Sequence, residues 1–349
     1  MKFSSNYERV MRELRQTEEF RQILVVDSGF PQQDFLDLTE ELSRLRVGNT
    51  VIDIQALFDL KCSLRTIQEC LRFLLRDDKD RYPTLRALAE KVELDPTLSK
   101  TLAKLIDDKG ELYDNASPDL AEIRSLMRRK QGEVDSRISQ TLRRAKQEGW
   151  APENAEVTIR NGRLVIPMLD THRRKIKGII QDESATRQTA YLEPSEVVEL
   201  NNDLRELEFE ERREIQRILA RFSDQLRTQL DPLINAYWFL AKIDFIRAKA
   251  KLALTLRAGM PNVSNVTQIG WLEARHPLLY LNYLKEHREH EVQPFDLTLS
   301  DEGHILIISG PNAGGKSVCL KAVGLIQYML QCGLLVPCRE TSEFGIFES

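Results

Sequence analysis

The chain has 349 residues, of which 42% are hydrophobic and 30% are charged, and its formal net charge is −4. This length allows two or three domains with a sizeable core. The near-balanced charge excludes a global basic field, so any nucleic-acid contact has to come from a local patch. No apolar run long enough to span a membrane and no signal-like N-terminus is present, so we expect a cytoplasmic protein without a membrane partner. The five cysteines lack CxxC or metal-ligand spacing, which favours reduced thiols.

Residues 1–115 predict a helical core domain made of short amphipathic helices. Apolar residues recur at spacings of three and four, as in Leu64, Ile67 and Leu71, which is typical of a helix face against a core. Asp95-Pro96 predicts a helix start, with the aspartate as cap and the proline at the first helical position. Nothing in this region indicates chemistry.

Two long helices are predicted next, an ascending one within 116–150 and a returning one within 196–260. In the first, apolar residues recur at three, four and seven from Leu120 to Ala145, and basic residues fill most other positions. A polar step near Lys130 interrupts this apolar seam. In the returning helix, Pro232 must produce a kink, or a cap and restart, because a mid-helix proline loses a hydrogen bond and clashes with the preceding turn.

Between these helices, residues 151–195 predict a small β module. Asn161-Gly162 separates two β-prone runs and is typical of a two-residue type I′ hairpin turn. Residues 177–194 predict two further strands around a Ser/Thr-rich turn. Because the module is short, the chain has to return near its starting point, so we expect antiparallel levers with a β clamp at their tip.

The densest basic run of the sequence lies in this module. We interpret it as a nucleic-acid-binding patch that contacts phosphates without reading sequence, the alternative being a solvated turn. It consists of His172, Arg173, Arg174, Lys175 and Lys177. A second basic series lines the ascending helix, where ordinary coiled-coil surface is the favoured interpretation because acidic residues are abundant on the opposing helix. Its members are Arg128, Arg129, Lys130, Arg143, Arg144 and Lys146.

The chemistry of the chain is concentrated in a G-x-x-x-x-G-K-S pattern within residues 261–349. The apolar run 304–308 predicts a buried strand before it and residues 318–330 predict a helix after it, which is the context that a P-loop requires. Its backbone N–H groups would cradle ATP, with Lys316 on the β- and γ-phosphates and the Ser317 hydroxyl on Mg²⁺. The predicted nucleotide-binding residues are Gly310, Pro311, Asn312, Ala313, Gly314, Gly315, Lys316, Ser317 and Val318.

No other catalytic constellation is predicted, since no Ser/His/Asp or Cys/His set and no nuclease-like acidic pair stands out. His287 and His290 lie among glutamates, but the segment lacks an apolar face, which favours a solvated loop over a metal site. Residues 275–277, Arg-His-Pro, are interpreted as a structural turn closed by proline. The alternative is a contact with the nucleotide side of the fold.

ISGPNAGGKS, preceded by EARHPLL at 273–279, resembles the MutS family. Residues 182–204 and the sequence IDFIRAKAKLA at 243–253 resemble its MutS-II subfamily, and the resemblance covers the whole chain. We expect no mismatch-reading module ahead of the helical domain, which argues against direct mismatch reading. The expected fold class is mainly α: a helical core domain, long antiparallel coiled-coil levers with a small β clamp, and the start of an α/β P-loop ATPase domain.

The resemblance implies a homodimer of the full-length protein that encloses branched or damaged DNA and suppresses recombination, or acts on stalled ribosomes through ribosomal RNA. It also implies an ATPase that often carries a nuclease-like C-terminal domain. Ser317 is followed by 32 residues, too few for the rest of such an ATPase, so we expect a truncated chain without appreciable ATP hydrolysis. Two alternatives remain open: a structural P-loop coiled-coil tether of the SMC kind, and a binding module whose P-loop does not close on nucleotide.

Overall fold

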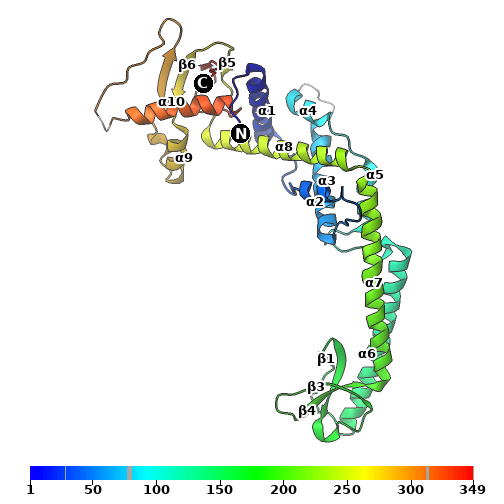
Figure 1. Ribbon diagram of the computed structural model, residues 1–349. Helices are drawn as coiled ribbons and strands as arrows, with labels where there is room; N and C mark the ends of the chain where they lie inside the picture. Colours follow the sequence, from blue (N-terminus) through cyan, green and yellow to red (C-terminus); the bar gives the residue numbers. More distant parts are fainter. Residues whose placement is uncertain (28, 77–80, 312–313, 349) are drawn as a thin grey trace. The chain divides into compact units, whose positions relative to one another are not determined.

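The computed structural model describes residues 1–27, 29–76, 81–311 and 314–348. It forms two compact units, unit 1 with residues 1–43, 59–99 and 229–349, and unit 2 with residues 44–58 and 100–228. Both are mainly helical, as predicted, and each contains one small sheet (Figure 1). Among the described residues, no helix combines the length and apolarity needed to cross a membrane.

The N-terminal third of the chain is helical, in agreement with the sequence. Its helices are α1 Tyr7–Val26, α2 Thr39–Arg44, α3 Ile54–Leu74, α4 Pro83–Ala89 and α5 Pro96–Leu105, followed by a 3₁₀ turn at Asp114–Ala116. The start of α5 confirms the prediction for Asp95-Pro96. The Asp95 carboxylate accepts the Thr97 N–H at 2.8 Å, and the proline, which needs no hydrogen bond there, opens the helix.

The rest of unit 1 combines three helices with a four-stranded sheet. The helices are α8 Leu230–Leu256, α9 Pro277–Lys285 and α10 Lys316–Gln331, with a 3₁₀ turn at Glu289–Glu291. The sheet has the order β5-β8-β6-β7, with β5 Asn262–Val263, β6 Ile269–Ala274, β7 Phe295–Leu299 and β8 Glu343–Phe344. Trp271 stacks on Phe344 with 4.8 Å between ring centroids, in a core that also buries Ile326 and Leu330 of α10. This packing fixes α10 in unit 1.

In unit 2, α6 (Pro118–Gln147) and α7 (Ser195–Arg227) lie side by side and antiparallel (Figure 1). Two cross-helix ion pairs show the antiparallel direction. Arg124 meets Glu211 at 2.7 Å, and Lys130, farther along α6, meets Asp203, which lies earlier in α7, at 2.8 Å. The second pair fills the polar step that the sequence places near Lys130. Predicted seam residues such as Leu120 are buried along the contact.

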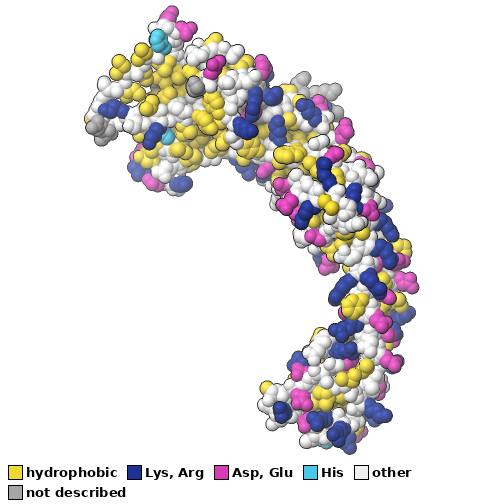
Figure 2. Space-filling model, in the orientation of Figure 1, with side chains coloured by type: hydrophobic (Ala, Val, Ile, Leu, Met, Phe, Trp, Pro, Cys, Tyr) yellow, Lys and Arg dark blue, Asp and Glu magenta, His cyan; other side chains and the backbone are white. Residues whose placement is uncertain are grey.

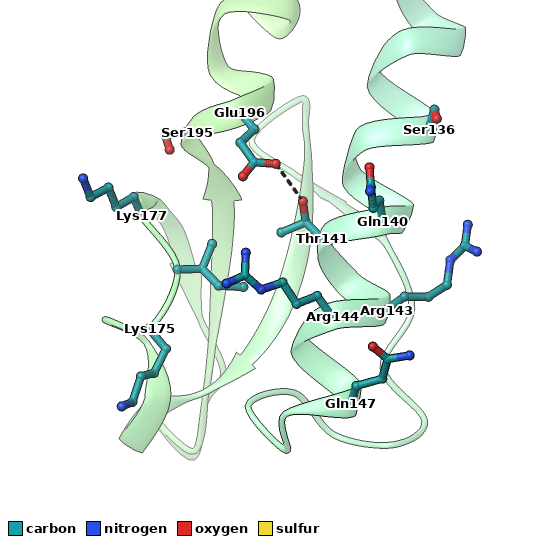
Figure 3. Close-up of a pocket in the computed structure, with 11 residues that line it drawn as sticks. Ser136, Gln140, Thr141, Arg143, Arg144, Gln147, Lys175, Lys177, Ser195 and Glu196 are labelled. Carbon is teal, nitrogen blue, oxygen red and sulfur yellow. Dashed lines mark hydrogen bonds between the residues drawn. The ribbon is translucent and has the colours of Figure 1, made fainter.

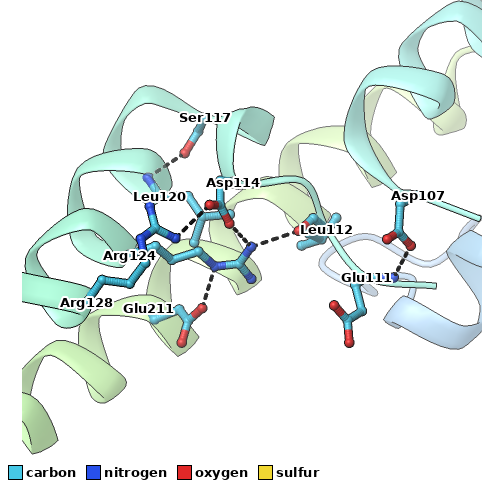
Figure 4. Close-up of polar contacts among 9 residues, drawn as sticks. All are labelled: Asp107, Glu111, Leu112, Asp114, Ser117, Leu120, Arg124, Arg128 and Glu211. Atoms are coloured by element: carbon cyan, nitrogen blue, oxygen red, sulfur yellow. Dashed lines mark hydrogen bonds and ion pairs between the residues drawn. The ribbon is translucent and has the colours of Figure 1, made fainter. Parts of the chain in front are cut away.

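Arg124 also fastens the start of α6 to the segment before it (Figure 4). Its guanidinium donates to the Leu112 carbonyl and to Asp114, both at 2.8 Å, and Arg128 donates to the other Asp114 oxygen at 2.8 Å. The hydrogen bonds from Arg124 and then Arg128 lower the pKa of the Asp114 carboxyl, although its burial opposes this. The charges of both arginines are therefore matched locally.

The β module of unit 2 has the order β1-β2-β4-β3. Its strands are β1 Thr158–Arg160, β2 Arg163–Leu169, β3 Gly178–Glu183 and β4 Thr189–Pro194, with a 3₁₀ turn at Asp170–His172. All pairs are antiparallel, and Asn161 (φ 52°) and Gly162 (φ 73°) both have the left-handed conformation that a type I′ turn requires, so the predicted hairpin is confirmed. The module packs Ile166 and Leu192 against Leu142 of α6.

The predicted returning helix is interrupted. α7 ends at Arg227 and α8 begins at Leu230, two residues before Pro232. The proline lies in the first turn of α8, where a backbone N–H has no helical acceptor, and this is the restart that the sequence left open. Gln229 rather than Asp231 occupies the cap position.

The predicted buried strand at 304–308 is wrong for this structure. These residues belong to no strand, and the Ile305 and Ile307 side chains are 76% and 85% exposed. A buried parallel strand needs hydrogen-bonded neighbours on both sides, and no strand in the described part of the chain pairs with this segment. Val318 and Leu320 of α10 are exposed apolar side chains as well. Figure 2 shows hydrophobic side chains gathered on the surface of unit 1.

Candidate nucleotide loop and cationic cleft

The glycine-rich segment of the predicted P-loop leads directly into α10. Gly310 (φ 145°) and Gly315 (φ 82°) have backbone conformations that L side chains rarely adopt, and a Cβ on Gly314 would lie 3.1 Å from the Pro311 carbonyl oxygen. The loop therefore depends on its glycines for close backbone curvature. Asn312 and Ala313 lie outside the described residues.

The groups that would hold a nucleotide converge at the start of α10. Lys316 is the first residue of α10, and its Nζ donates to the Gly310 carbonyl at 2.5 Å. The ammonium therefore lies beside the residue at which the glycine-rich segment begins. Gly315 caps the helix without a side-chain acceptor, which leaves the positive end of the helix for an anion. The Ser317 hydroxyl is exposed in the same turn, so the residues fit phosphates accompanied by Mg²⁺. Val318 is also exposed there.

The Arg-His-Pro element forms the start of α9. His276 is the cap residue, its Nδ1 accepts the Leu279 N–H at 3.3 Å, and Pro277 takes the first helical position. This geometry favours the structural interpretation of the element. Burial holds the pKa of His276 below its usual value of 6.5, which agrees with a neutral ring acting as acceptor.

The basic run 172–177 lies between β2 and β3 in unit 2, and its members are in different surroundings. Arg173 is paired with Asp170 at 3.1 Å and lies 3.6 Å from Glu183. Nδ1 of His172 lies 3.1 Å from the Thr171 hydroxyl. The remaining three residues, Arg174, Lys175 and Lys177, are exposed.

Two members of this run line a cleft of about 900 Å³ between α6 and the β module (Figure 3). Lys175 and Lys177 come from the loop that leads into β3, and Arg143 and Arg144 come from the last turns of α6. The other lining residues are Ser136, Gln140, Thr141, Gln147, Ile176, Ser195 and Glu196. The structure thus brings together two basic segments that are far apart in the sequence.

Comparison with known proteins identifies the family. A protein named endonuclease MutS2 from Geobacillus sp. (strain WCH70) is 33% identical over 348 residues, which is 99% of this chain and 43% of that protein. The MutS2 proteins of Finegoldia magna and Ligilactobacillus salivarius are each 34% identical, over 97% and 99% of this chain and 42% and 43% of their own lengths. No protein-family model matches the chain.

The chain belongs to the MutS family. These relatives all carry the MutS2 name, in agreement with the MutS-II resemblance of the sequence. The chain spans about two-fifths of their length.

Arg143 and Arg144 are the residues of this MutS-family chain that sequence reasoning assigned to ordinary coiled-coil surface and that the structure places in the cleft. The physical reason is where α7 begins. The Thr141 hydroxyl already donates to Glu196, the second residue of α7, at 3.3 Å. The α6 turns beyond Thr141 therefore extend past the start of α7, where Leu142 packs on the β module and Arg144 extends toward the loop before β3 (Figure 3). The register between two helices is not readable from one sequence.

Of the remaining candidates, the histidines at 287–290 do not form a metal site in the described part of the chain, where no group of three or more His, Cys, Asp or Glu side chains could hold an ion. The acidic residues around them pair with an arginine instead. Arg288 meets Glu291 at 2.7 Å and Glu286 at 3.1 Å. All three side chains are about half exposed.

Proposed function

We propose that this chain is the ATP-binding and nucleic-acid-embracing part of a MutS2-type protein. The observation that carries the proposal is the position of Lys316, whose ammonium crosses a glycine loop at the start of α10 in a chain of the MutS family. Anionic phosphate suits that site because a lysine and a helix N-terminus converge there. Mg²⁺ would come with the nucleotide, with Ser317 as its protein ligand.

The nucleic-acid half of the proposal rests on unit 2. The antiparallel pair α6 and α7 acts as a lever that presents the β module and its exposed basic residues to DNA or ribosomal RNA. Branched DNA and stalled ribosomes are the candidate targets, and the complete protein acts as a homodimer in the cytoplasm. A structural tether of the SMC kind is not favoured, because the relatives that match over nearly the whole chain are MutS2 proteins.

Nucleotide binding is tested by thermal unfolding with and without Mg·ATP. A ligand at about 100 times its Kd stabilises the folded state by about 2.7 kcal/mol, so the wild-type midpoint should rise. Lys316→Ala should abolish the rise, whereas Lys321→Ala, which removes an exposed lysine from the same helix, should retain it. An equal rise in all three proteins would place the nucleotide elsewhere, and no rise in wild type would favour a P-loop that does not close on nucleotide.

Nucleic-acid binding is tested with four-way-junction DNA, linear duplex and purified ribosomes across a salt series. If the chain contacts phosphates, the logarithm of the binding constant should fall linearly with the logarithm of the salt concentration. The preferred ligand would distinguish a role on DNA from a role on ribosomes. Absence of binding to all three at low salt would contradict this half of the proposal and leave the nucleotide half intact.

A further inference from the structure

Basic residues from the end of α6 and from the loop before β3 line the cleft in unit 2. In Figure 3 Arg144 extends from α6 toward that loop, while Arg143, Lys175 and Lys177 extend outward. In both segments the basic residues lie next to buried or half-buried apolar ones. Leu142 is buried just before Arg143 and Arg144, and Ile176 packs against the same core between Lys175 and Lys177. Since these apolar neighbours are fixed in the core, the backbone beneath each basic side chain is fixed as well.

These four charges are not matched by carboxylates of the chain. Within residues 1–27, 29–76, 81–311 and 314–348, no ion pair involves Arg143, Arg144, Lys175 or Lys177. Elsewhere on α6, basic residues such as Arg124 are paired. An incoming polyanion would therefore meet uncompensated positive charge in the cleft, whereas Arg124, Arg128 and Lys130 farther up α6 already have carboxylate partners.

The other lining residues indicate which part of a polyanion the cleft would recognise. Of the described residues that line it, Ile176 is the one clearly apolar side chain and none is aromatic, so bases have no surface on which to stack. Gln140, Gln147 and Ser136 offer neutral hydrogen-bond donors to phosphate or sugar oxygens. Glu196, which accepts a hydrogen bond from Thr141, would repel phosphate and so directs it toward the basic residues.

We propose that this cleft binds the sugar-phosphate backbone of a nucleic-acid strand through Arg143, Arg144, Lys175 and Lys177, without reading base sequence. The inference rests on the proposed function, in that it locates the nucleic-acid contact which that function requires. It assigns the contact to the end of α6 as well as to the basic run, and it leaves Arg173, which is already paired, outside the contact.

The test compares two double variants of the full chain that remove the same charge from the same helix. Arg143→Ala with Arg144→Ala removes two cleft residues, and Arg128→Ala with Lys130→Ala removes two residues paired with Asp114 and Asp203. Binding of a fluorescein-labelled single strand and of a labelled duplex is followed by anisotropy across a salt series. The cleft variant should lower the salt slope by about 1.4 for the single strand or about 1.8 for the duplex, and the paired-residue variant should leave it unchanged.

A conservative double variant, Arg143→Lys with Arg144→Lys, separates charge from folding, because it should restore the slope if phosphate contact is the role. Strands of different base sequence should bind the wild type equally. If both alanine variants keep the wild-type slope, the cleft inference is overturned while nucleic-acid binding by the chain stands. If wild type binds neither probe at low salt, the proposed nucleic-acid function itself fails, and the inference fails with it.

Discussion

Glu193 provides the sharpest test of how the β module holds its shape. Its carboxylate is fully buried and accepts hydrogen bonds from Arg163 at 2.7 Å, Asn201 at 2.8 Å and Gln181 at 2.6 Å, which join β2, β3 and α7 at one point. Replacement by leucine leaves all three donors without this acceptor. Breaking a buried charge pair costs about 3–5 kcal/mol, so Glu193→Leu should destabilise the module by about that amount.

Glu183→Gln is the matched control on the same sheet. Glu183 is 43% exposed and lies 3.6 Å from Arg173, and an exposed pair of this kind contributes about 0.5 kcal/mol or less. Hydrogen exchange followed by mass spectrometry measures the local opening of β3 and β4. Glu193→Leu should accelerate exchange there roughly 100-fold or more, while amides of α8 in unit 1 serve as the internal reference. Equal exchange in the two variants would refute the reasoning.

Two further predictions concern unit 1. Lys249 is almost fully buried and donates to the Cys332 carbonyl at 2.8 Å, so Lys249→Met should lower stability by about 1–3 kcal/mol in urea unfolding, while Lys251→Met on the exposed face should change it little. His276 has a lowered pKa in the folded state, so its contribution to stability is complete above its usual value of 6.5 and is lost as pH falls below it. His276→Ser keeps a side-chain acceptor for the Leu279 N–H and should reduce the loss of stability between about pH 7 and pH 5. If the variant loses stability with falling pH as steeply as wild type, His276 is not the group responsible.

The features predicted correctly from sequence are those determined by a few neighbouring residues. The hairpin at Asn161-Gly162 requires two positive φ angles that these two residues tolerate, and the cap at Asp95 requires one carboxylate two residues before an N–H. Helix α6 was predictable because its apolar spacing extends over many turns. None of these features depends on knowing which distant segment lies opposite.

The failures have the opposite origin. The run 304–308 has the composition of a buried strand, but whether it becomes one depends on a neighbouring strand, and no strand of the described residues pairs with it. The restart of the helix at Leu230 was predicted only as one of two outcomes, because Pro232 is compatible with a kink or with a first turn. In both cases the deciding interaction is tertiary.

The two arginines Arg173 and Arg144 show why a count of basic residues is a poor guide to phosphate binding. Arg173 lies at the centre of the densest basic run, yet Asp170 and Glu183 already lie within 4 Å of its guanidinium. Arg144 belongs to a pattern typical of ordinary helix surface, yet it faces a cleft with two lysines and no matching carboxylate pair in the described residues. A phosphate gains most from a charge that has not been neutralised, so Arg144→Ala should weaken nucleic-acid binding more than Arg173→Ala. If Arg173→Ala weakened binding more, the density of basic residues in the sequence, rather than their ion pairing in the fold, would determine where phosphate binds.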